Sequence, residues 1–166
     1  ASVNVFFEAH SNEDYLRGLK LTVDGTCGDS DFHAEQVLWH NFGNIYIGVE
    51  NAVFWYPKNA GEQPLYDVTV KLWRDGEVCD SKKIKFGIRT VELLRTSTTD
   101  EEGNGEFVFK VNGKKVFCMG SNWVPLDAFH SRDLNRLHPA LDMLDDLGCN
   151  IVRCWGGNVY ENDEFF

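Results

Sequence analysis

The first ninety residues alternate apolar and polar side chains, which is the period of a β-strand with one buried face. The alternation recurs in five separate runs, at residues 3–7, 19–23, 32–39, 45–49 and 66–72. Asp75-Gly76 is a dipeptide typical of a tight hairpin turn, and the alternation resumes after it with Ile84 and Phe86. Short strands separated by such turns are typical of an immunoglobulin-like antiparallel β-sandwich. We therefore predict a domain of this kind over residues 1–95, in a chain that is mainly β.

The pattern changes in residues 96–166. Residues 96–105 are polar, acidic and glycine-bearing, which predicts a loop or a hairpin tip. A turn is expected at Asn112-Gly113, followed by a strand over residues 116–119. Residues 149–154 are predicted to form a second, mostly buried strand.

Leucines between these two predicted strands recur at the spacing of one helix face: Leu134, Leu137, Leu141, Leu144 and Leu147. Gly148 is expected to end the helix. Pro139 conflicts with an uninterrupted helix, because proline lacks the backbone donor and disfavours helix in the residue before it. Two alternatives stay open: a kink at Pro139, or a helix that begins near it. Strand, helix and strand make a β-α-β unit, the beginning of an α/β domain. A closed (β/α)8 TIM barrel needs roughly 250 residues, so residues 96–166 are predicted to be a truncated one.

Charge and composition exclude several classes of function. The chain has 16 Lys+Arg against 26 Asp+Glu, a formal net charge of −10. Nucleic-acid binding draws on clustered basic side chains, so no nucleic-acid partner is expected. No apolar run approaches the roughly 18 residues that span a bilayer, so no membrane partner is expected either. Aromatic residues make up 13%, which suits a β core and a sugar-binding surface equally well. The five cysteines form no regular framework and are expected to be free thiols, which favours a cytoplasmic, bacterial location.

Three blocks of sequence resemble family 2 glycoside hydrolases and follow the order of that family. The segments that resemble its immunoglobulin-like domain are 54–57 (Phe-Trp-Tyr-Pro), 61–66 and 86–92. The segments that resemble the entry into its catalytic barrel are 111–114 and 120–127, and residues 150–157 with Tyr160-Glu161 resemble the second barrel strand and its loop. The forms Asn-Trp-x-Pro-x-Asp and Arg-x-Trp-Gly-Gly resemble the β-mannosidase branch. Asn158 departs from the small residue that is common there.

The resemblance implies a retaining hydrolase of terminal β-D-mannosides that works through two glutamates, with no cofactor. Retention needs two carboxyl groups about 5–5.5 Å apart across the glycosidic bond. In the family both lie on later barrel strands, one of them in an Asn-Glu pair. The only such pair here, Asn12-Glu13, precedes the barrel. We therefore expect no catalytic residue in this chain and no activity from the 166 residues alone.

The same resemblance implies part of a substrate-binding wall at the ends of the two barrel strands. Trp155 offers an indole face to a sugar ring, and Gly156 and Gly157 let the backbone approach it. Arg153 lies two residues before Trp155 and points the same way along a strand. The alternatives are that Trp155 belongs to the core beside a glycine turn and that Arg153 is a surface arginine.

Four further residues are candidates for the same wall: Asn122, Trp123, Asp127 and Glu161. Asp127 either hydrogen-bonds sugar hydroxyls or caps its own loop. Glu161 is expected to brace the Trp155 loop or Arg153 rather than to transfer protons.

Other chemistries find no support in the sequence. The five histidines make no metal-binding pattern, and Cys149 and Cys154 would face opposite sides of one strand, so no metal site is predicted. The alternative function is a self-contained immunoglobulin-like module that binds carbohydrate or another protein. The expected partners are a carbohydrate substrate and a second copy of the chain, which would associate through the exposed edge of the barrel strands.

Overall fold

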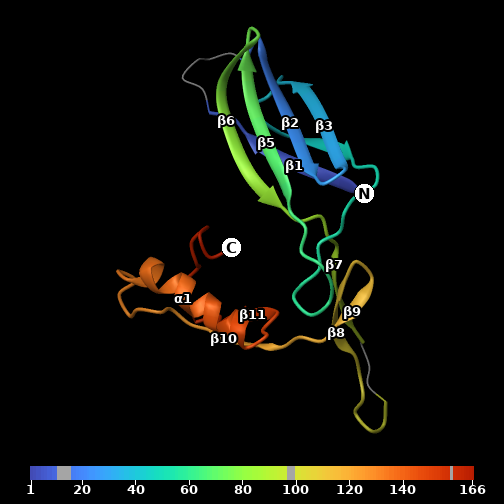
Figure 1. Cartoon of the computed structure of the whole chain (residues 1–166), viewed down its shortest axis with the longest axis vertical. Helices are drawn as coiled ribbons and strands as arrows, with labels where there is room; N and C mark the ends of the chain where they lie inside the picture. The colour runs from blue at the N-terminus through green and yellow to red at the C-terminus, as the bar shows by residue number, and fades with distance from the viewer. Residues whose placement is uncertain (11–15, 97–99, 158) are drawn as a thin grey trace. The chain divides into compact units, whose positions relative to one another are not determined.

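The computed structural model describes residues 1–10, 16–96, 100–157 and 159–166. Asn12-Glu13, residues 97–99 of the loop expected at 96–105, and Asn158 lie outside the described residues. The chain divides into two compact units (Figure 1). The first comprises Ala1–Trp55 and Gln63–Arg89, and the second comprises Tyr56–Glu62 and Thr90–Phe166.

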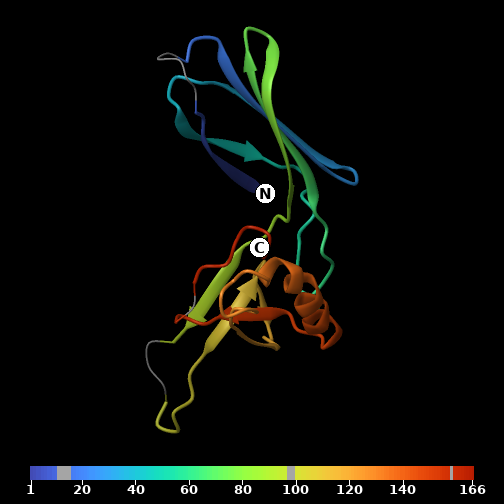
Figure 2. The same cartoon turned by 90° about the vertical axis from the view of Figure 1, so that its left-hand side faces the viewer.

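The first unit is an antiparallel β-sandwich. Its strands are β1 (Ser2–Glu8), β2 (Leu19–Cys27), β3 (Ser30–Val37), β4 (Phe42–Gly48), β5 (Tyr66–Arg74) and β6 (Glu77–Phe86). They form a two-stranded sheet, β1-β4, and a four-stranded sheet in the order β3-β2-β5-β6. Figure 2 shows the smaller sheet lying opposite the larger one. The five alternating runs and the return strand of the sequence therefore all form strands.

The strand order is that of an immunoglobulin sandwich. In that fold strands B and E are neighbours in one sheet, and C′, C, F and G follow one another in the other. The sheet β1-β4 corresponds to strands B and E, and the sheet β3-β2-β5-β6 corresponds to strands C′, C, F and G. The letters follow the order of the strands along the chain. The hairpin between β5 and β6 turns at Asp75-Gly76, whose φ angles of 50° and 91° are those of a type I′ turn.

The core lies between the two sheets of the sandwich. It is built from the inward positions of the alternating runs: Val3, Leu19, Leu21, Val23, Phe32, Ile45, Ile47, Tyr66 and Val68, with Leu38, Val49 and Ile88 at its ends. Because consecutive strand residues point to opposite faces, the period-2 pattern puts the core residues of each strand on its inward face.

Tyr66 is fully buried at the start of β5 and joins three segments through its hydroxyl group. The Val53 backbone N–H donates to the Tyr66 oxygen at 2.9 Å. Ser30 Oγ donates to the Glu50 carbonyl at 3.4 Å. Because the serine proton is used there, the Tyr66 hydroxyl donates to Ser30 Oγ, 2.7 Å away. A tyrosine at the start of strand F that bonds the upstream backbone is the tyrosine corner of immunoglobulin folds.

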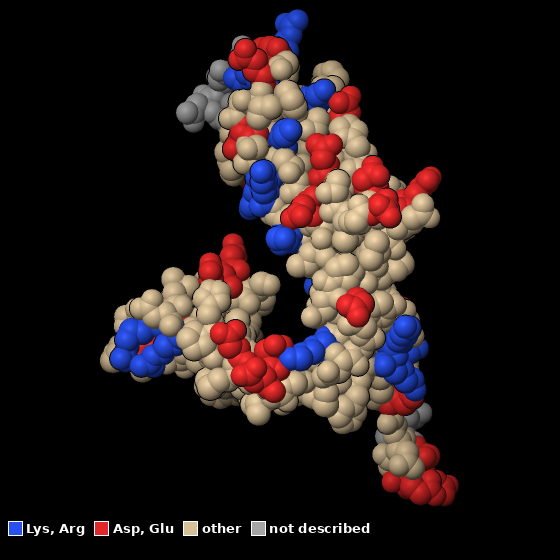
Figure 3. All heavy atoms as spheres, in the orientation of Figure 1, with Lys and Arg blue, Asp and Glu red and all other residues tan. Residues whose placement is uncertain are grey.

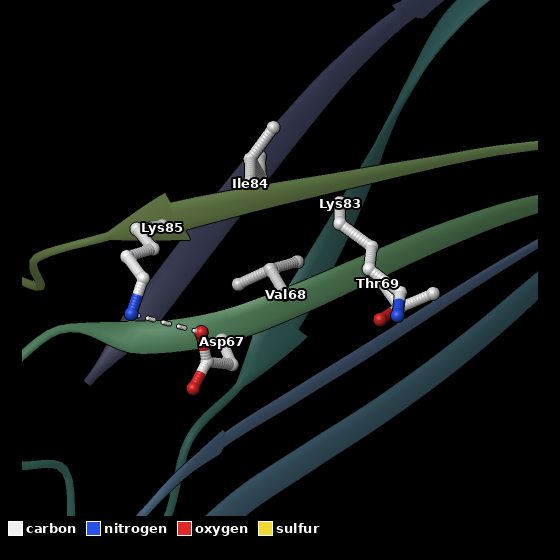
Figure 4. Close-up of a pocket in the computed structure, with 6 residues that line it drawn as sticks. All are labelled: Asp67, Val68, Thr69, Lys83, Ile84 and Lys85. Carbon is white, nitrogen blue, oxygen red and sulfur yellow. Dashed lines mark ion pairs between the residues drawn. The ribbon is translucent and has the colours of Figure 1, made fainter.

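Strand β6 lies at the edge of the larger sheet and carries lysines along its outer side. Two of these lysines, Lys83 and Lys85, line a shallow hollow between β5 and β6 (Figure 4). Lys85 lies opposite Asp67 in the register and pairs with it at 3.3 Å, while Lys83 lies opposite Thr69. Edge lysines hinder the pairing of this strand with other chains. On the face shown in Figure 3, acidic and basic side chains are interspersed over the sandwich.

The second unit contains two small sheets and a helix. Strands β7 (Val91–Arg95), β8 (Phe107–Val111) and β9 (Lys114–Val116) are antiparallel. Strands β10 (Gly120–Trp123) and β11 (Ile151–Cys154) pair in parallel, and helix α1 (Asp133–Asp146) connects them. The expected turn at Asn112-Gly113 joins β8 to β9, with φ angles of 49° and 77°. The predicted β-α-β unit is present, and the barrel to which we assign it stays a prediction.

Two expectations for the strands of this unit are wrong. Residues 117–119 are not strand; the parallel strand begins at Gly120 instead, because the Met119 backbone is hydrogen-bonded to Asn150. The second strand begins at Ile151 and is not mostly buried, since Arg153 and Cys154 are exposed. An apolar run marks a strand but does not say how much of it another layer covers.

Helix α1 is continuous through Pro139, so the alternative in which it begins near the proline is wrong. It ends as expected at Gly148, which has φ of 77°. The Gly148 N–H donates to the Asp145 carbonyl at 2.9 Å and the Cys149 N–H to the Leu144 carbonyl at 3.0 Å, the two bonds of a Schellman motif.

The described helix is not long and apolar enough to cross a membrane. The five cysteines are free thiols, and the cytoplasmic location stays a prediction.

Candidate functional site

Strands β10 and β11 place two polar candidates side by side. Their parallel register sets Asn122 opposite Arg153, and the arginine NH1 donates to Asn122 Oδ1 at 3.1 Å. The two strands approach closely at Gly120, where a Cβ would lie 1.9 Å from the Ile151 carbonyl oxygen. Only glycine fits there, so this residue allows the close approach of the two strands that carry Asn122 and Arg153.

Trp155 follows β11 directly and presents an exposed indole. Its backbone N–H donates to the Trp123 carbonyl at 3.2 Å, which extends the pairing one residue past the strands. Trp155 is 54% exposed in this chain. Gly157 lies against the ring, since a Cβ there would come within 2.6 Å of it, whereas the space beside Gly156 is open. An exposed ring supported from behind is suited to stacking on an apolar ligand face.

Trp123 is buried and has a different role from Trp155. It is 6% exposed, and its Nε1–H donates to Glu161 Oε1 at 2.9 Å. Its ring also packs on Phe165, with the centroids 5.1 Å apart. The pair therefore connects the end of β10 to the segment after β11. Glu161 bonds Trp123 rather than Arg153.

Asp127 is buried in the loop between β10 and α1, and both of its carboxylate oxygens are engaged. Oδ1 accepts from Arg132 at 2.7 Å and Oδ2 from Ser131 Oγ at 2.9 Å. The hydrogen bond from Arg132, with that from Ser131, lowers the pKa of Asp127 to about 2. The same carboxylate raises the pKa of Arg132. Asp127 thus stays ionised at working pH and holds its own loop, which is the loop-cap alternative.

The candidates fall into local groups rather than one complete pocket. Asn122 contacts Arg153, Trp123 contacts Glu161, and Asp127 is bonded within its own loop. The small pocket beside Trp123, Leu126, Asp133 and Glu161 has room for about one water molecule and none for a sugar ring. The described residues of the second unit therefore do not bring the candidates together in one sugar-sized pocket.

Among the described residues, no three His, Cys, Asp or Glu side chains gather as metal ligands. Sequence reasoning missed two residues of the site. Phe165 packs on Trp123, and Asn150 bonds the backbone before β10. The only signal for Asn150 was its place at the start of the third block.

Comparison with known proteins identifies the class to which this sandwich and β-α-β unit belong. The family model of glycosyl hydrolases family 2 matches residues 2–89, so the chain belongs to that family. The match includes the first fifty residues, where the sequence showed only a strand pattern.

Among individual relatives, the chain is 38% identical over 128 residues to β-mannosidase of Capra hircus, covering 74% of this chain and 14% of the relative. It is 30% identical over 167 residues to β-mannosidase B of Thermothelomyces thermophilus, covering 100% and 19%. The chain thus spans about a fifth or less of the length of these curated relatives.

Two solved structures share the fold over nearly the whole chain. The β-D-mannosidase of Dictyoglomus thermophilum superposes with a TM-score of 0.74 at 28% identity, over 99% of this chain and 20% of that one. The exo-chitosanase of Amycolatopsis orientalis superposes with a TM-score of 0.66 at 25% identity, over 99% and 18%.

Proposed function

We propose that the protein to which this chain belongs is a β-mannosidase that hydrolyses terminal β-D-mannosides with retention. The observation that carries the proposal is the similarity to β-mannosidases, at 38% and 30% identity over most or all of the chain. The Arg153-x-Trp155-Gly156-Gly157 segment lies within the 30% match, which covers the whole chain, and the exposed indole of Trp155 supports a sugar contact.

The arrangement of the second unit supports its role as the start of a catalytic barrel. In a (β/α)8 barrel the active site lies at the carboxyl ends of the parallel strands. Trp155 follows the carboxyl end of β11, and Asp127 lies in the loop after β10. Two apolar side chains of α1, Leu134 and Met143, are more than half exposed, and so is Leu147, which follows the helix directly. In the proposed barrel, neighbouring elements would cover them.

Within the proposed active site, this chain binds and orients the substrate but does not perform the acid–base chemistry. Trp155 stacks on the sugar, and Arg153 with Asn122 offers hydrogen bonds to hydroxyl groups or to a catalytic carboxylate. Both candidate carboxylates are already engaged, Glu161 by Trp123 and Asp127 by Arg132. With its pKa of about 2, Asp127 would carry no proton to donate at neutral pH. We infer that the acid and the nucleophile come from other residues of the protein.

The experiment compares the full-length enzyme on nitrophenyl β-D-mannoside, β-D-glucoside, β-D-galactoside and β-D-glucosaminide. The proposal expects the mannoside to have the highest kcat/KM and the first-formed sugar to be the β-anomer. Preference for the glucosaminide, as the likeness to an exo-chitosanase would allow, overturns the mannosidase assignment and leaves the family intact. The 166-residue chain alone is expected to cleave none of them.

A further inference from the structure

The side-chain amide of Asn150 joins three backbone segments of the second unit. Its Oδ1 accepts from the Met119 N–H at 2.9 Å. Its Nδ2 donates to the Phe117 carbonyl at 3.0 Å and to the Lys58 carbonyl at 3.3 Å. Three of the four hydrogen bonds that an asparagine side chain can make are therefore used on backbone groups.

The backbone of Asn150 bonds the same residue that its side chain bonds. The Asn150 N–H donates to the Met119 carbonyl at 2.8 Å, so both polar groups of Met119 are bound to this one asparagine. Met119 directly precedes β10 and Asn150 directly precedes β11. The contact therefore lies one residue before the first pair of the parallel ladder, which is Gly120 with Ile151.

The third segment, Tyr56–Glu62, is itself well ordered by local contacts. The Tyr56 N–H donates to the Glu62 carbonyl at 2.9 Å. From this segment, Lys58 Nζ reaches Asp145 Oδ1 at 2.6 Å, and Asn59 Nδ2 donates to the Gly148 carbonyl at 3.0 Å. The Lys58 carbonyl that Asn150 bonds is thus held against the end of α1.

We propose that Asn150 is a positioning residue for the substrate-binding loop, since its amide sets the register of β11 on β10. With that register, Arg153 lies opposite Asn122 and the Trp155 N–H reaches the Trp123 carbonyl. A slip of one residue would turn Arg153 to the other face of the sheet. The inference rests on the proposed function, in which Arg153 and Trp155 contact the sugar.

The test replaces Asn150 by aspartate in the full-length enzyme. The change keeps the shape and the acceptor but removes both donors and sets a carboxylate against the Phe117 and Lys58 carbonyls. Because a misplacement of about 1 Å near the substrate costs up to about 100-fold in rate, kcat/KM for the nitrophenyl mannoside should fall roughly 10- to 100-fold at pH 7. The loss should appear mainly in KM. It should shrink at lower pH, where the introduced carboxyl gains a proton and one donor.

The matched control is Asn135→Asp, which makes the same chemical change on the exposed surface of α1. It should leave kcat/KM within twofold of wild type at every pH. A second readout, hydrogen exchange of the peptide that contains Arg153 and Trp155, does not depend on the substrate. Exchange there should be at least about tenfold faster in Asn150→Asp, with β2 and β8 unchanged.

The outcomes separate the proposed function of the enzyme from the proposed role of Asn150. If the wild-type enzyme does not cleave the mannoside, the proposed function fails, and the exchange result still decides the role of Asn150. If Asn150→Asp matches the control in both kinetics and exchange, Asn150 does not position the loop. If Asn150→Asp also loosens β2, the uncharged variant Asn150→Ser takes its place in the exchange measurement, and wild-type protection of Trp155 in that variant overturns the proposal.

Discussion

Replacing Tyr66 by phenylalanine removes one hydroxyl group from the sandwich and leaves the buried ring in place. The hydroxyl accepts from the Val53 N–H at 2.9 Å and bonds Ser30 Oγ at 2.7 Å, in a region where Ser30 is 3% exposed. A neutral hydrogen bond contributes about 0.5–1.5 kcal/mol net, and a buried group left without its partner costs about 1–3 kcal/mol. Two lost bonds, one of them fully buried, predict a loss of about 2 kcal/mol in the free energy of unfolding.

Urea unfolding of the 166-residue chain at low micromolar concentration measures the change, with tryptophan fluorescence, to which Trp55 and Trp73 of the sandwich contribute, as the signal. With a urea slope of roughly 1–3 kcal/mol/M, the midpoint should fall by about 1 M. Tyr46→Phe is the matched control, because Tyr46 is 73% exposed on β4. The control should stay within about 0.5 kcal/mol of wild type. If Tyr66→Phe behaves like Tyr46→Phe, the tyrosine corner does not hold the loop between β4 and β5.

Three further predictions concern the second unit. The folded pKa of Asp127, about 2, lies below its ordinary value of 3.8, so its stabilising contribution is complete above pH 3.8 and is lost as the pH falls through 2. In thermal melts over this pH range, Asp127→Asn should lack this loss of stability. An equal acid dependence in wild type and variant contradicts the role given to Asp127. Gly157→Ala puts a methyl group within 2.6 Å of the Trp155 ring and should shift its fluorescence, whereas Gly156→Ala, with open space, should not. The 166-residue chain should self-associate through β10, β11 and the exposed face of α1; light scattering should show oligomers that Met143→Glu weakens, and a monomer at all concentrations refutes this.

The sequence by itself determined most of the sandwich. Alternation with period 2 is a local signal, and it placed all six strands of the first unit and the inward side chains of the core. The turns at Asp75-Gly76 and Asn112-Gly113 and the helix end at Gly148 were predictable for the same reason. Each needs a positive φ that Gly, Asn or Asp adopts at low cost. The β-α-β order and the family motifs were also visible in the chain.

Only the tertiary structure decided which candidate residues act together. The burial of Trp123 against Phe165, its bond to Glu161 and the capture of Asp127 by Arg132 depend on side chains that meet across loops. The strand expected over residues 116–119 fails at residues 117–119 for a similar reason. The Phe117 carbonyl and the Met119 N–H are bonded to the side chain of Asn150, about thirty residues later.

The assignment of Tyr56–Glu62 to the second unit is the furthest from any local pattern. Lys58 and Asn150 are 92 residues apart in the chain, and neither residue type in its own neighbourhood indicates the other. Periodicity reports how a segment faces its nearest layer, while a hydrogen bond between distant segments depends on the positions of both. For that reason the strands and turns followed from the sequence, and the arrangement of the candidate site required the fold.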